Sequence, residues 1–178
     1  MKSRGFSLIE TMTVVALLAL CATETTPVFV AWRVRDEVNA RAGALLGTLA
    51  YARNEAIRRK VRITVCRVDA AHNCLASSAV CPSGVADWSC GWAVMADGAG
   101  GPVRLRVQPA LDGIGVASPP GAMTFSPPAG QAIGVLRDFE IAPRTASAAT
   151  DGEAWRRCIR IAAGGRARIS DGACKASS

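Results

Sequence analysis

Hydrophobic residues follow three successive patterns along the chain. Residues 6–22 are almost continuously apolar, residues 32–59 repeat with a helical period, and the chain beyond Lys60 alternates every second residue. The helical stretch places one apolar stripe on a helix face and leaves charged residues such as Arg41 elsewhere. The stripe comprises Val34, Val38, Ala42, Leu45, Leu46, Leu49, Ala52, Ala56 and Ile57. This pattern predicts a helix that packs one side on a sheet.

The alternating part of the chain predicts a set of short antiparallel strands. Val61, Ile63 and Val65 face one way, whereas Arg62 and Thr64 face the other. Glycine and proline separate the further strands that we expect, at residues 91–96, 103–108, 123–126, 135–141, 156–162 and 166–170. The predicted fold class is α+β, in which a long N-terminal spine helix packs on an antiparallel β-sheet domain. We find no internal repeat and no second domain.

The N-terminal apolar run follows Lys2 and Arg4 and contains one carboxylate, that of Glu10. A helix over residues 6–22 rises about 26 Å, close to the thickness of a membrane's hydrocarbon core. A charge near the centre of such a span costs about 2.5–3.5 kcal/mol, so Glu10 needs a partner. A cleaved secretory signal peptide is the alternative. Two features argue against it, since no small-x-small cleavage site follows and the apolar face resumes at residues 28–30.

Six of the seven cysteines lie beyond the apolar run, an even number that fits disulfide bonds in an oxidising compartment. They are Cys66, Cys74, Cys81, Cys90, Cys158 and Cys174. No C-x-x-C pair is present and His72 is the only histidine, so we expect no metal and no cofactor. Spacing leaves the pairing open, and the simplest local pairs are Cys66–Cys74 and Cys81–Cys90. The domain is therefore expected in the periplasm or outside the cell.

The net charge of +7 favours nucleic acid or anionic surfaces in general and identifies neither. The sequence shows no arrangement of candidate catalytic residues. His72 stands alone in an expected loop, the serine and aspartate residues lack a basic partner, and no phosphate-cradling glycine loop is present. The sequence therefore predicts a protein that is not an enzyme.

The stretch RRCIRIAAGGRARISDGAC, residues 156–174, predicts two strands joined by a Gly-Gly turn. A two-residue turn would mix polar and apolar faces. A three-residue turn at residues 163–165 instead places Ile159 beside Ile169 and keeps the apolar residues together. We therefore prefer the second register. It also brings Cys174 close to Cys158, so we expect a disulfide bond between them to close the hairpin.

In this register Arg160 lies opposite Arg168, and Arg166 shares their face. Like charges across a strand pair destabilise a free sheet, and a bound polyanion would relieve that cost. Arginine suits this role because its planar fork holds a phosphate through two hydrogen bonds, and Gly165 permits a close backbone approach. No array of aromatic side chains is nearby, so we expect phosphate contacts without base reading. The next candidates, on one face of strand 103–108, are Arg104 and Arg106.

The stretch GFSLIE, residues 5–10, resembles the class III signal of type IV pilins and type II secretion pseudopilins. The resemblance implies cleavage after Gly5 by a prepilin peptidase, methylation of Phe6, and a Glu10 carboxylate that neutralises the N-terminal amine of a neighbouring subunit. The protein is then a single-pass inner-membrane protein before it joins other pilins in a filament at the cell surface. The implied parts are a leader (1–5), a transmembrane helix half (6–31), an amphipathic helix half (32–60) and a periplasmic or extracellular β-rich domain (61–178).

The stretch LLGTLAYARNEAIRRKVRITVC, residues 45–66, resembles the helix-to-strand segment of the FimT/GspH family of minor pilins and pseudopilins. WSCGWAVMADG, residues 88–98, resembles the family's second strand, and GRAR, residues 165–168, matches its Gly-Arg-x-Arg motif. In FimT-type members the C-terminal region binds DNA during natural transformation. The resemblance therefore implies a DNA-binding minor pilin. The alternative is a structural subunit without DNA binding, either a priming minor pilin or an H-type pseudopilin of type II secretion.

We predict that the mature protein begins at a methylated Phe6. Intact-mass analysis of the membrane-extracted protein should show the loss of residues 1–5 and the gain of a methyl group, because the junction after Gly5 has the sequence of a prepilin cleavage site. A mature chain that begins near Pro27 would instead identify a cleaved secretory signal.

Overall fold

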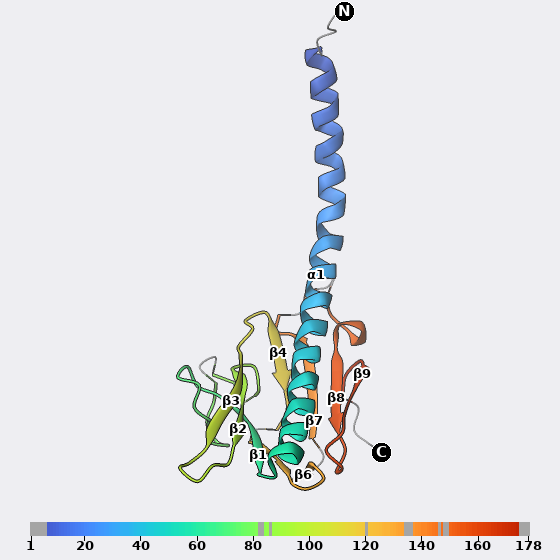
Figure 1. Cartoon of the computed structure of the whole chain (residues 1–178). Coiled ribbons are helices and arrows are strands. Elements are labelled where there is room, and N and C mark those ends of the chain that lie inside the picture. Colours follow the sequence, from blue (N-terminus) through green and yellow to red (C-terminus); the bar gives the residue numbers. More distant parts are fainter. Residues whose placement is uncertain are drawn as a thin grey trace, which may run out of the picture.

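The computed structural model describes residues 7–81, 84–85, 87–119, 121–133, 137–145, 147 and 150–174. One long helix projects from a domain made of two antiparallel sheets, and its C-terminal half lies against both of them (Figure 1). This arrangement confirms the α+β class, a spine helix on antiparallel β-structure, that the sequence predicts. Gly5 and Phe6 lie outside the described residues.

Helix α1 (Leu8–Arg59) is continuous over 52 residues and joins the two helix halves that the sequence separates near residue 31. Ser7 caps its start, where the Ser7 Oγ accepts a hydrogen bond from the backbone N–H of Glu10 at 3.3 Å. Lys60 ends it in the left-handed conformation, with a φ angle of 58°. Among the helical residues that the structure describes, none form a segment with the length and apolarity needed to cross a membrane.

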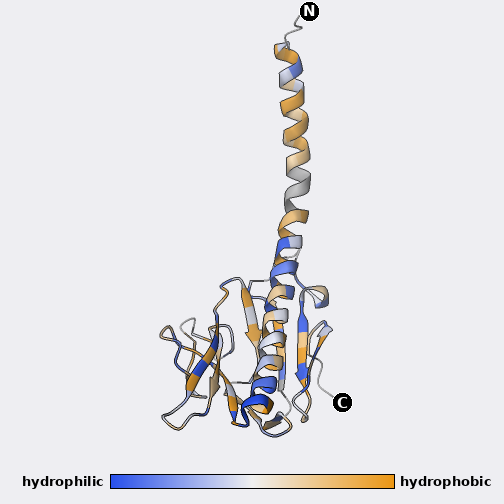
Figure 2. Cartoon of the chain, viewed as in Figure 1, coloured by the Kyte–Doolittle hydropathy of each residue, from blue (hydrophilic) through white to orange (hydrophobic). Residues whose placement is uncertain are grey.

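The N-terminal half of α1 is coloured largely as hydrophobic in Figure 2. Its large apolar side chains are exposed. Apolar surface of this extent is typical of a segment that another molecule or a membrane covers. The exposed large side chains of this half are Leu8, Ile9, Met12, Val14, Val15, Leu17, Leu18, Leu20, Val28, Phe29, Val30 and Trp32.

The C-terminal half of α1 buries most of the apolar stripe that the sequence predicts. The prediction is wrong for Ile57, which is 39% exposed, and for Arg41, which is only 3% exposed although the pattern leaves it outside the stripe. Glu55 is also buried, and hydrogen bonds from Arg58 and then Arg59 lower the pKa of its carboxyl. The fully buried stripe residues are Val38, Ala42, Leu45, Leu49, Ala52 and Ala56.

Two antiparallel sheets form the rest of the domain, in the orders β3-β2-β1-β5-β6 and β4-β7-β8-β9. The first sheet contains β1 (Ile63–Arg67), β2 (Gly91–Ala96), β3 (Val103–Pro109), β5 (Met123–Ser126) and β6 (Gln131–Ile133). The second contains β4 (Ile114–Ala117), β7 (Arg137–Pro143), β8 (Arg157–Ile161) and β9 (Ala167–Asp171). A short 3-10 helix, η1 (Glu153–Trp155), precedes β8.

The strand positions agree with the sequence where alternation is long enough to detect. Strands β2 and β5 occupy the predicted residues, and β1, β3, β7, β8 and β9 overlap theirs, although residues 135–136 of the expected strand lie outside the described residues. The alternation does not predict β4 or β6, because three or four residues show no clear period. The sequence also leads us to expect one sheet rather than two. Pairings such as β1 with β5 and β4 with β7 join segments far apart in the chain and leave no local trace.

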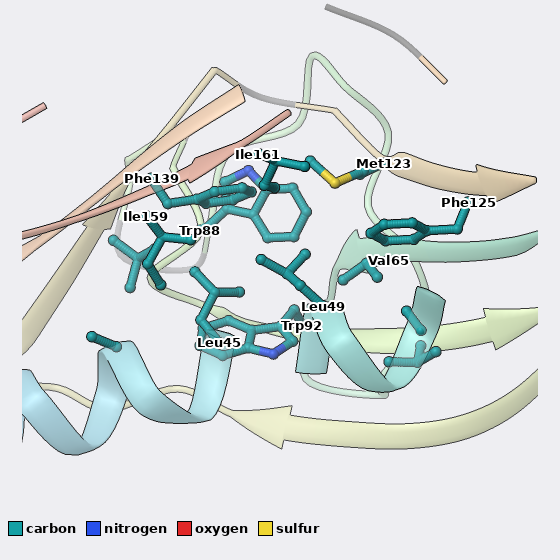
Figure 3. Packing of buried hydrophobic residues seen from close by; sticks show 14 of the residues in the cluster. Leu45, Leu49, Val65, Trp88, Trp92, Met123, Phe125, Phe139, Ile159 and Ile161 are labelled. Carbon is teal, nitrogen blue, oxygen red and sulfur yellow. The ribbon is translucent and has the colours of Figure 1, made fainter. Parts of the chain in front are cut away.

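Two tryptophans link the helix to the sheets in the core (Figure 3). Trp88 and Trp92 are fully buried, beside Leu49 of α1 in the same apolar cluster. The Trp88 ring meets the Phe139 ring of β7 nearly edge-on, with centroids 5.0 Å apart. Trp92 Nε1 donates a hydrogen bond to Thr48 Oγ1 of α1 at 3.2 Å. The core therefore ties both sheets to one helix face.

Leu49→Ala should lower the free energy of unfolding by about 2–5 kcal/mol, because it leaves a cavity between the helix and the sheets. Ile57→Ala is the matched control, since it removes an aliphatic side chain of the same size from a partly exposed position. Its cost should be about 1 kcal/mol or less. Chemical denaturation followed by tryptophan fluorescence measures both. An equal loss of unfolding free energy in the two variants would contradict the burial of Leu49, and not Ile57, against the sheets.

Candidate functional site

Strands β8 and β9 form the hairpin in the register that the sequence predicts. Ile159 pairs with Ile169, and Arg160 pairs with Arg168. The Ala162 N–H donates to the Arg166 carbonyl at 3.0 Å and the Gly165 N–H to the Ala162 carbonyl at 2.8 Å, so residues 163–165 form a three-residue turn. The predicted register is confirmed.

Three arginines of this hairpin line one exposed groove. Arg160, Arg166, Arg168 and Ser170 are its polar lining residues, and Ala162 and Ile169 are its apolar ones. The groove encloses about 600 Å³. Within the described ranges, neither Arg166 nor Arg168 forms an ion pair. We call this surface, the groove with its three arginines, the arginine hairpin. The guanidinium N–H groups of the arginine hairpin can donate hydrogen bonds to an anion at the surface.

A carboxylate that no sequence pattern indicates lies beside the arginine hairpin. Asp138 of β7 pairs with Arg160 of β8, and its Oδ1 lies 2.9 Å from Arg160 Nε. The repulsion expected between Arg160 and Arg168 is therefore reduced by the protein itself, and a polyanion is not needed to offset it. Asp138 is not predictable from the sequence, because its contact with Arg160 depends on the β7–β8 pairing, which no local pattern reveals.

The turn of the hairpin is held against α1 and the β5–β6 connection. Arg53 of α1 donates from Nε to the Gly164 carbonyl and from Nη2 to the Ala129 carbonyl, both at 3.3 Å. Gly165 has a φ angle of 74°, and a Cβ there would lie 2.1 Å from the Gly130 carbonyl oxygen. The close backbone approach that Gly165 permits is therefore made by the protein's own chain. Gly165 positions the arginine hairpin rather than leaving room for a ligand.

Arg104 and Arg106 are not brought to the arginine hairpin. Both belong to β3, at the edge of the other sheet, and a bulge at Leu105 turns them to opposite faces. The Arg106 guanidinium lies over the Tyr51 ring of α1, 5.8 Å from its centroid. Arg104 Nη1 donates to the His72 carbonyl at 3.4 Å. The shared face that alternation predicts for these two arginines is wrong.

Among the residues that the structure describes, three disulfide bonds are present, and they join the expected pairs. The Cα–Cα distances are 5.5 Å for Cys66–Cys74, 5.4 Å for Cys81–Cys90 and 5.0 Å for Cys158–Cys174, all ordinary for a disulfide bond. The third bond fastens the segment after β9 to β8, beside the arginine hairpin.

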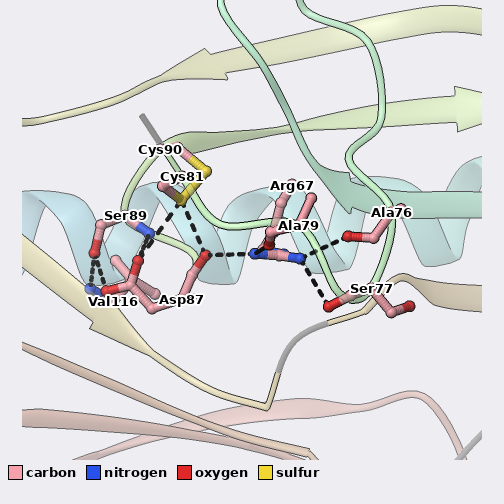
Figure 4. The surroundings of a disulfide bond; sticks show 9 residues. All are labelled: Arg67, Ala76, Ser77, Ala79, Cys81, Asp87, Ser89, Cys90 and Val116. Atoms are coloured by element: carbon pink, nitrogen blue, oxygen red, sulfur yellow. Dashed lines mark hydrogen bonds between the residues drawn. A yellow bond between two sulfur atoms is a disulfide. The ribbon is translucent and has the colours of Figure 1, made fainter. Parts of the chain in front are cut away.

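A buried arginine, Arg67, organises the loop around the second disulfide bond (Figure 4). Arg67 is fully buried, and its Nη1 and Nη2 atoms donate to the carbonyls of Ala79 and Ala76, each at 2.9 Å. In the same loop Ser89 Oγ donates to Asp87 Oδ2 at 2.6 Å. The Arg67 side chain therefore holds the loop and does not belong to an anion site.

Glu10 lies exposed in the first turn of α1, among exposed apolar side chains such as Ile9 and Met12. A carboxylate in the first turn interacts favourably with the partial positive charge of a helix N-terminus. The cleavage site at Gly5 and Phe6 lies outside the described residues.

Solved structures share this architecture. The crystal structure of the type IV minor pilin FimU from Pseudomonas aeruginosa (strain PAO1) matches with a TM-score of 0.54 at 20% sequence identity, over 76% of this chain and 90% of FimU. The minor pseudopilin EpsH from the type 2 secretion system of Vibrio cholerae matches with a TM-score of 0.52 at 13% identity, over 76% of this chain and 97% of EpsH. The fold is that of minor pilins and pseudopilins.

A family model described as type II transport protein GspH matches residues 41–165. The chain belongs to the GspH family, in agreement with the resemblance of its sequence. A second model, the prokaryotic N-terminal methylation motif, matches residues 1–23, the segment that contains Gly5, Phe6 and Glu10. No curated protein matches the sequence. Family and fold together support the role of a minor pilin or pseudopilin.

Gly165→Ala should lower the free energy of unfolding by about 2 kcal/mol or more, because the new Cβ meets the Gly130 carbonyl and the backbone keeps a left-handed φ. Gly164→Ala is the matched control, since a Cβ at Gly164 meets nothing within 4 Å. Thermal unfolding of both variants checks the difference. Similar melting temperatures would contradict the packing of the turn against Gly130.

Proposed function

We propose that this chain is a minor pilin that joins a type IV pilus and binds DNA through the arginine hairpin, for DNA uptake in natural transformation. The observation that carries this proposal is the exposed groove lined by Arg160, Arg166 and Arg168. The resemblance of residues 165–168 to the Gly-Arg-x-Arg motif supports the same function.

Arg166 and Arg168 are the principal phosphate ligands in this proposal. Arg166 directly precedes β9 and Arg168 belongs to it. The two residues are two positions apart in extended chain, so their Cα atoms are about 7 Å apart on one side of the hairpin. Each guanidinium can hold a phosphate through two parallel hydrogen bonds. Arg160 contributes less, because a phosphate has to compete with Asp138 for it. Contacts of this kind position a nucleic acid without reading its sequence.

The N-terminal segment supplies the other partners. We infer that a prepilin peptidase cleaves after Gly5, that Phe6 is then methylated, and that Glu10 pairs with the amine of a neighbouring pilin. Before assembly the exposed apolar half of α1 is held in the inner membrane, with the β-rich domain in the periplasm. The exposure of residues such as Leu17 and Phe29 supports this inference, because such surface needs an apolar cover.

A structural subunit is the second candidate function. A priming minor pilin, or an H-type pseudopilin of type II secretion, needs only the spine helix and the two sheets. The long exposed apolar surface of α1 supports a structural subunit as well as it supports a DNA-binding minor pilin. The arginine hairpin is the feature that separates the two candidates, since only the DNA-binding function uses it.

The double variant Arg166→Gln/Arg168→Gln should weaken DNA binding without unfolding the domain. Each lost phosphate contact reduces the slope of log affinity against log salt by about 0.9 on duplex DNA, so the slope should fall in magnitude by about 1.8. The loss should be similar for unrelated DNA sequences. Fluorescence anisotropy with the full chain in detergent micelles, at several salt concentrations, measures both quantities.

The matched control is Arg104→Gln/Arg106→Gln, which removes the same charge from β3 in the other sheet. Its salt slope should stay close to that of the unchanged protein. An unchanged affinity and slope in a folded Arg166→Gln/Arg168→Gln variant would reject the arginine hairpin as a DNA site and leave the structural subunit.

A further inference from the structure

A small groove lies between α1 and the end of β3. Its walls include Ala40, Arg41 and Ala44 of α1 and, across from them, Gln108, Pro109 and Leu111, and it encloses about 190 Å³. We call it the helix groove. Most of its wall is apolar, so the guanidinium of Arg41 is its distinctive group. The helix groove shares no residue with the arginine hairpin.

Arg41 is buried with only part of its hydrogen-bonding capacity used. Its Nη1 donates to the Pro109 carbonyl at 2.7 Å, and its guanidinium carbon lies 4.0 Å from the centroid of the Trp92 ring. Its Nε and Nη2 atoms are buried and have no acceptor among the described residues. Arg67 differs in degree, because both of its terminal nitrogens donate to backbone carbonyls and its Nε alone lacks an acceptor among the described residues.

Burying a guanidinium without an anion is unfavourable, since the charge loses its hydration. Burial lowers the pKa of Arg41 from its ordinary value to about 10, so the side chain remains protonated at neutral pH. The contact with the Trp92 ring offsets part of this cost. A residue that weakens the isolated subunit in this way is typical of a binding site, where a partner supplies the missing group.

We propose that the helix groove receives a carboxylate side chain from the spine helix of a neighbouring filament subunit, with Arg41 as its cation. Nε and Nη2 form one edge of the guanidinium, and their parallel N–H bonds match the two oxygens of a carboxylate. The apolar walls fit the aliphatic stem of a glutamate or aspartate. Because the two nitrogens lie below the surface, the guanidinium turns from the Trp92 ring toward the groove as the carboxylate enters.

The position of the helix groove on α1 selects the neighbouring subunit as the source. Phe29 and Val30 are 59% and 52% exposed. They precede Ala40 and Arg41 by about three helical turns, roughly 16 Å, and therefore lie on the same face of α1. A neighbouring spine helix that covers Phe29 and Val30 continues along the helix groove. The proposal depends on filament assembly and not on DNA binding.

Sodium propionate serves as the carboxylate probe, with the full chain in detergent micelles at constant ionic strength. Propionate should raise the melting temperature of the unchanged protein in a saturable manner, and propionamide, its uncharged analogue, should not. Arg41→Met should abolish this response and should itself melt about 4 °C higher without ligand, because an unpaired buried cation is replaced by an apolar side chain. Arg41→Lys, which keeps the charge but not the paired edge, should also lose the response.

The exposed Arg35 of α1 provides the matched control, since Arg35→Met removes the same charge from a solvated position. It should keep both the melting temperature and the propionate response. No propionate effect on the unchanged protein, or a melting temperature of Arg41→Met well below it, would overturn the site and make Arg41 a packing residue.

Incorporation into filaments tests the source of the carboxylate. In filament-forming cells both variants should accumulate in the membrane equally, and Arg41→Met should enter sheared filaments about tenfold less than Arg35→Met. Normal incorporation of Arg41→Met would overturn the proposal even with propionate binding, because the groove would then take a free carboxylate. DNA binding by Arg41→Met should be unchanged, which separates this site from the arginine hairpin.

Discussion

A single helical stripe, from Val38 to Ala56, supplies the apolar surface on which both sheets close. The two sheets share no strand, and they meet in one core cluster against the helix, where Trp88, which precedes β2, contacts Phe139 of β7. Burial of apolar area is the main favourable term in folding. The positions of the two sheets therefore depend on α1. The arginine hairpin is one example, because its turn is fixed by Arg53 of the same helix.

Local patterns predict the parts of the structure that local geometry decides. The helix period gives the buried stripe, and the three-residue turn gives the register that sets Arg160 opposite Arg168. Local patterns do not predict features that depend on pairing between strands far apart in the sequence. The bulge at Leu105 adds one residue to a two-residue alternation, which reverses the face of Arg104 relative to Arg106. Asp138 and Arg41 were missed for a similar reason, since their surroundings come from other elements.

The residues of the Gly-Arg-x-Arg motif, 165–168, have two different physical roles. Gly165 packs against Gly130 and holds the turn, whereas Arg166 and Arg168 face the groove. The family's helix motif contributes Arg53, so the two stretches that carry the resemblance meet in space. Positive charge is also distributed unequally in the groove. Arg160 is partly neutralised by Asp138, and the strongest attraction for an anion lies at the outer strand, β9.

The placement of the disulfide bonds determines how the subunit carries force. All three link residues between 66 and 174, and none includes a residue of α1. Traction on the projecting helix therefore loads the helix–sheet contacts in shear, and no disulfide cross-link between α1 and the sheets shares the load. The apolar stripe, the Trp92–Thr48 hydrogen bond and the two bonds of Arg53 resist it together. The covalent links instead stiffen the loops and the hairpin, so a strained subunit yields first between its helix and its sheets.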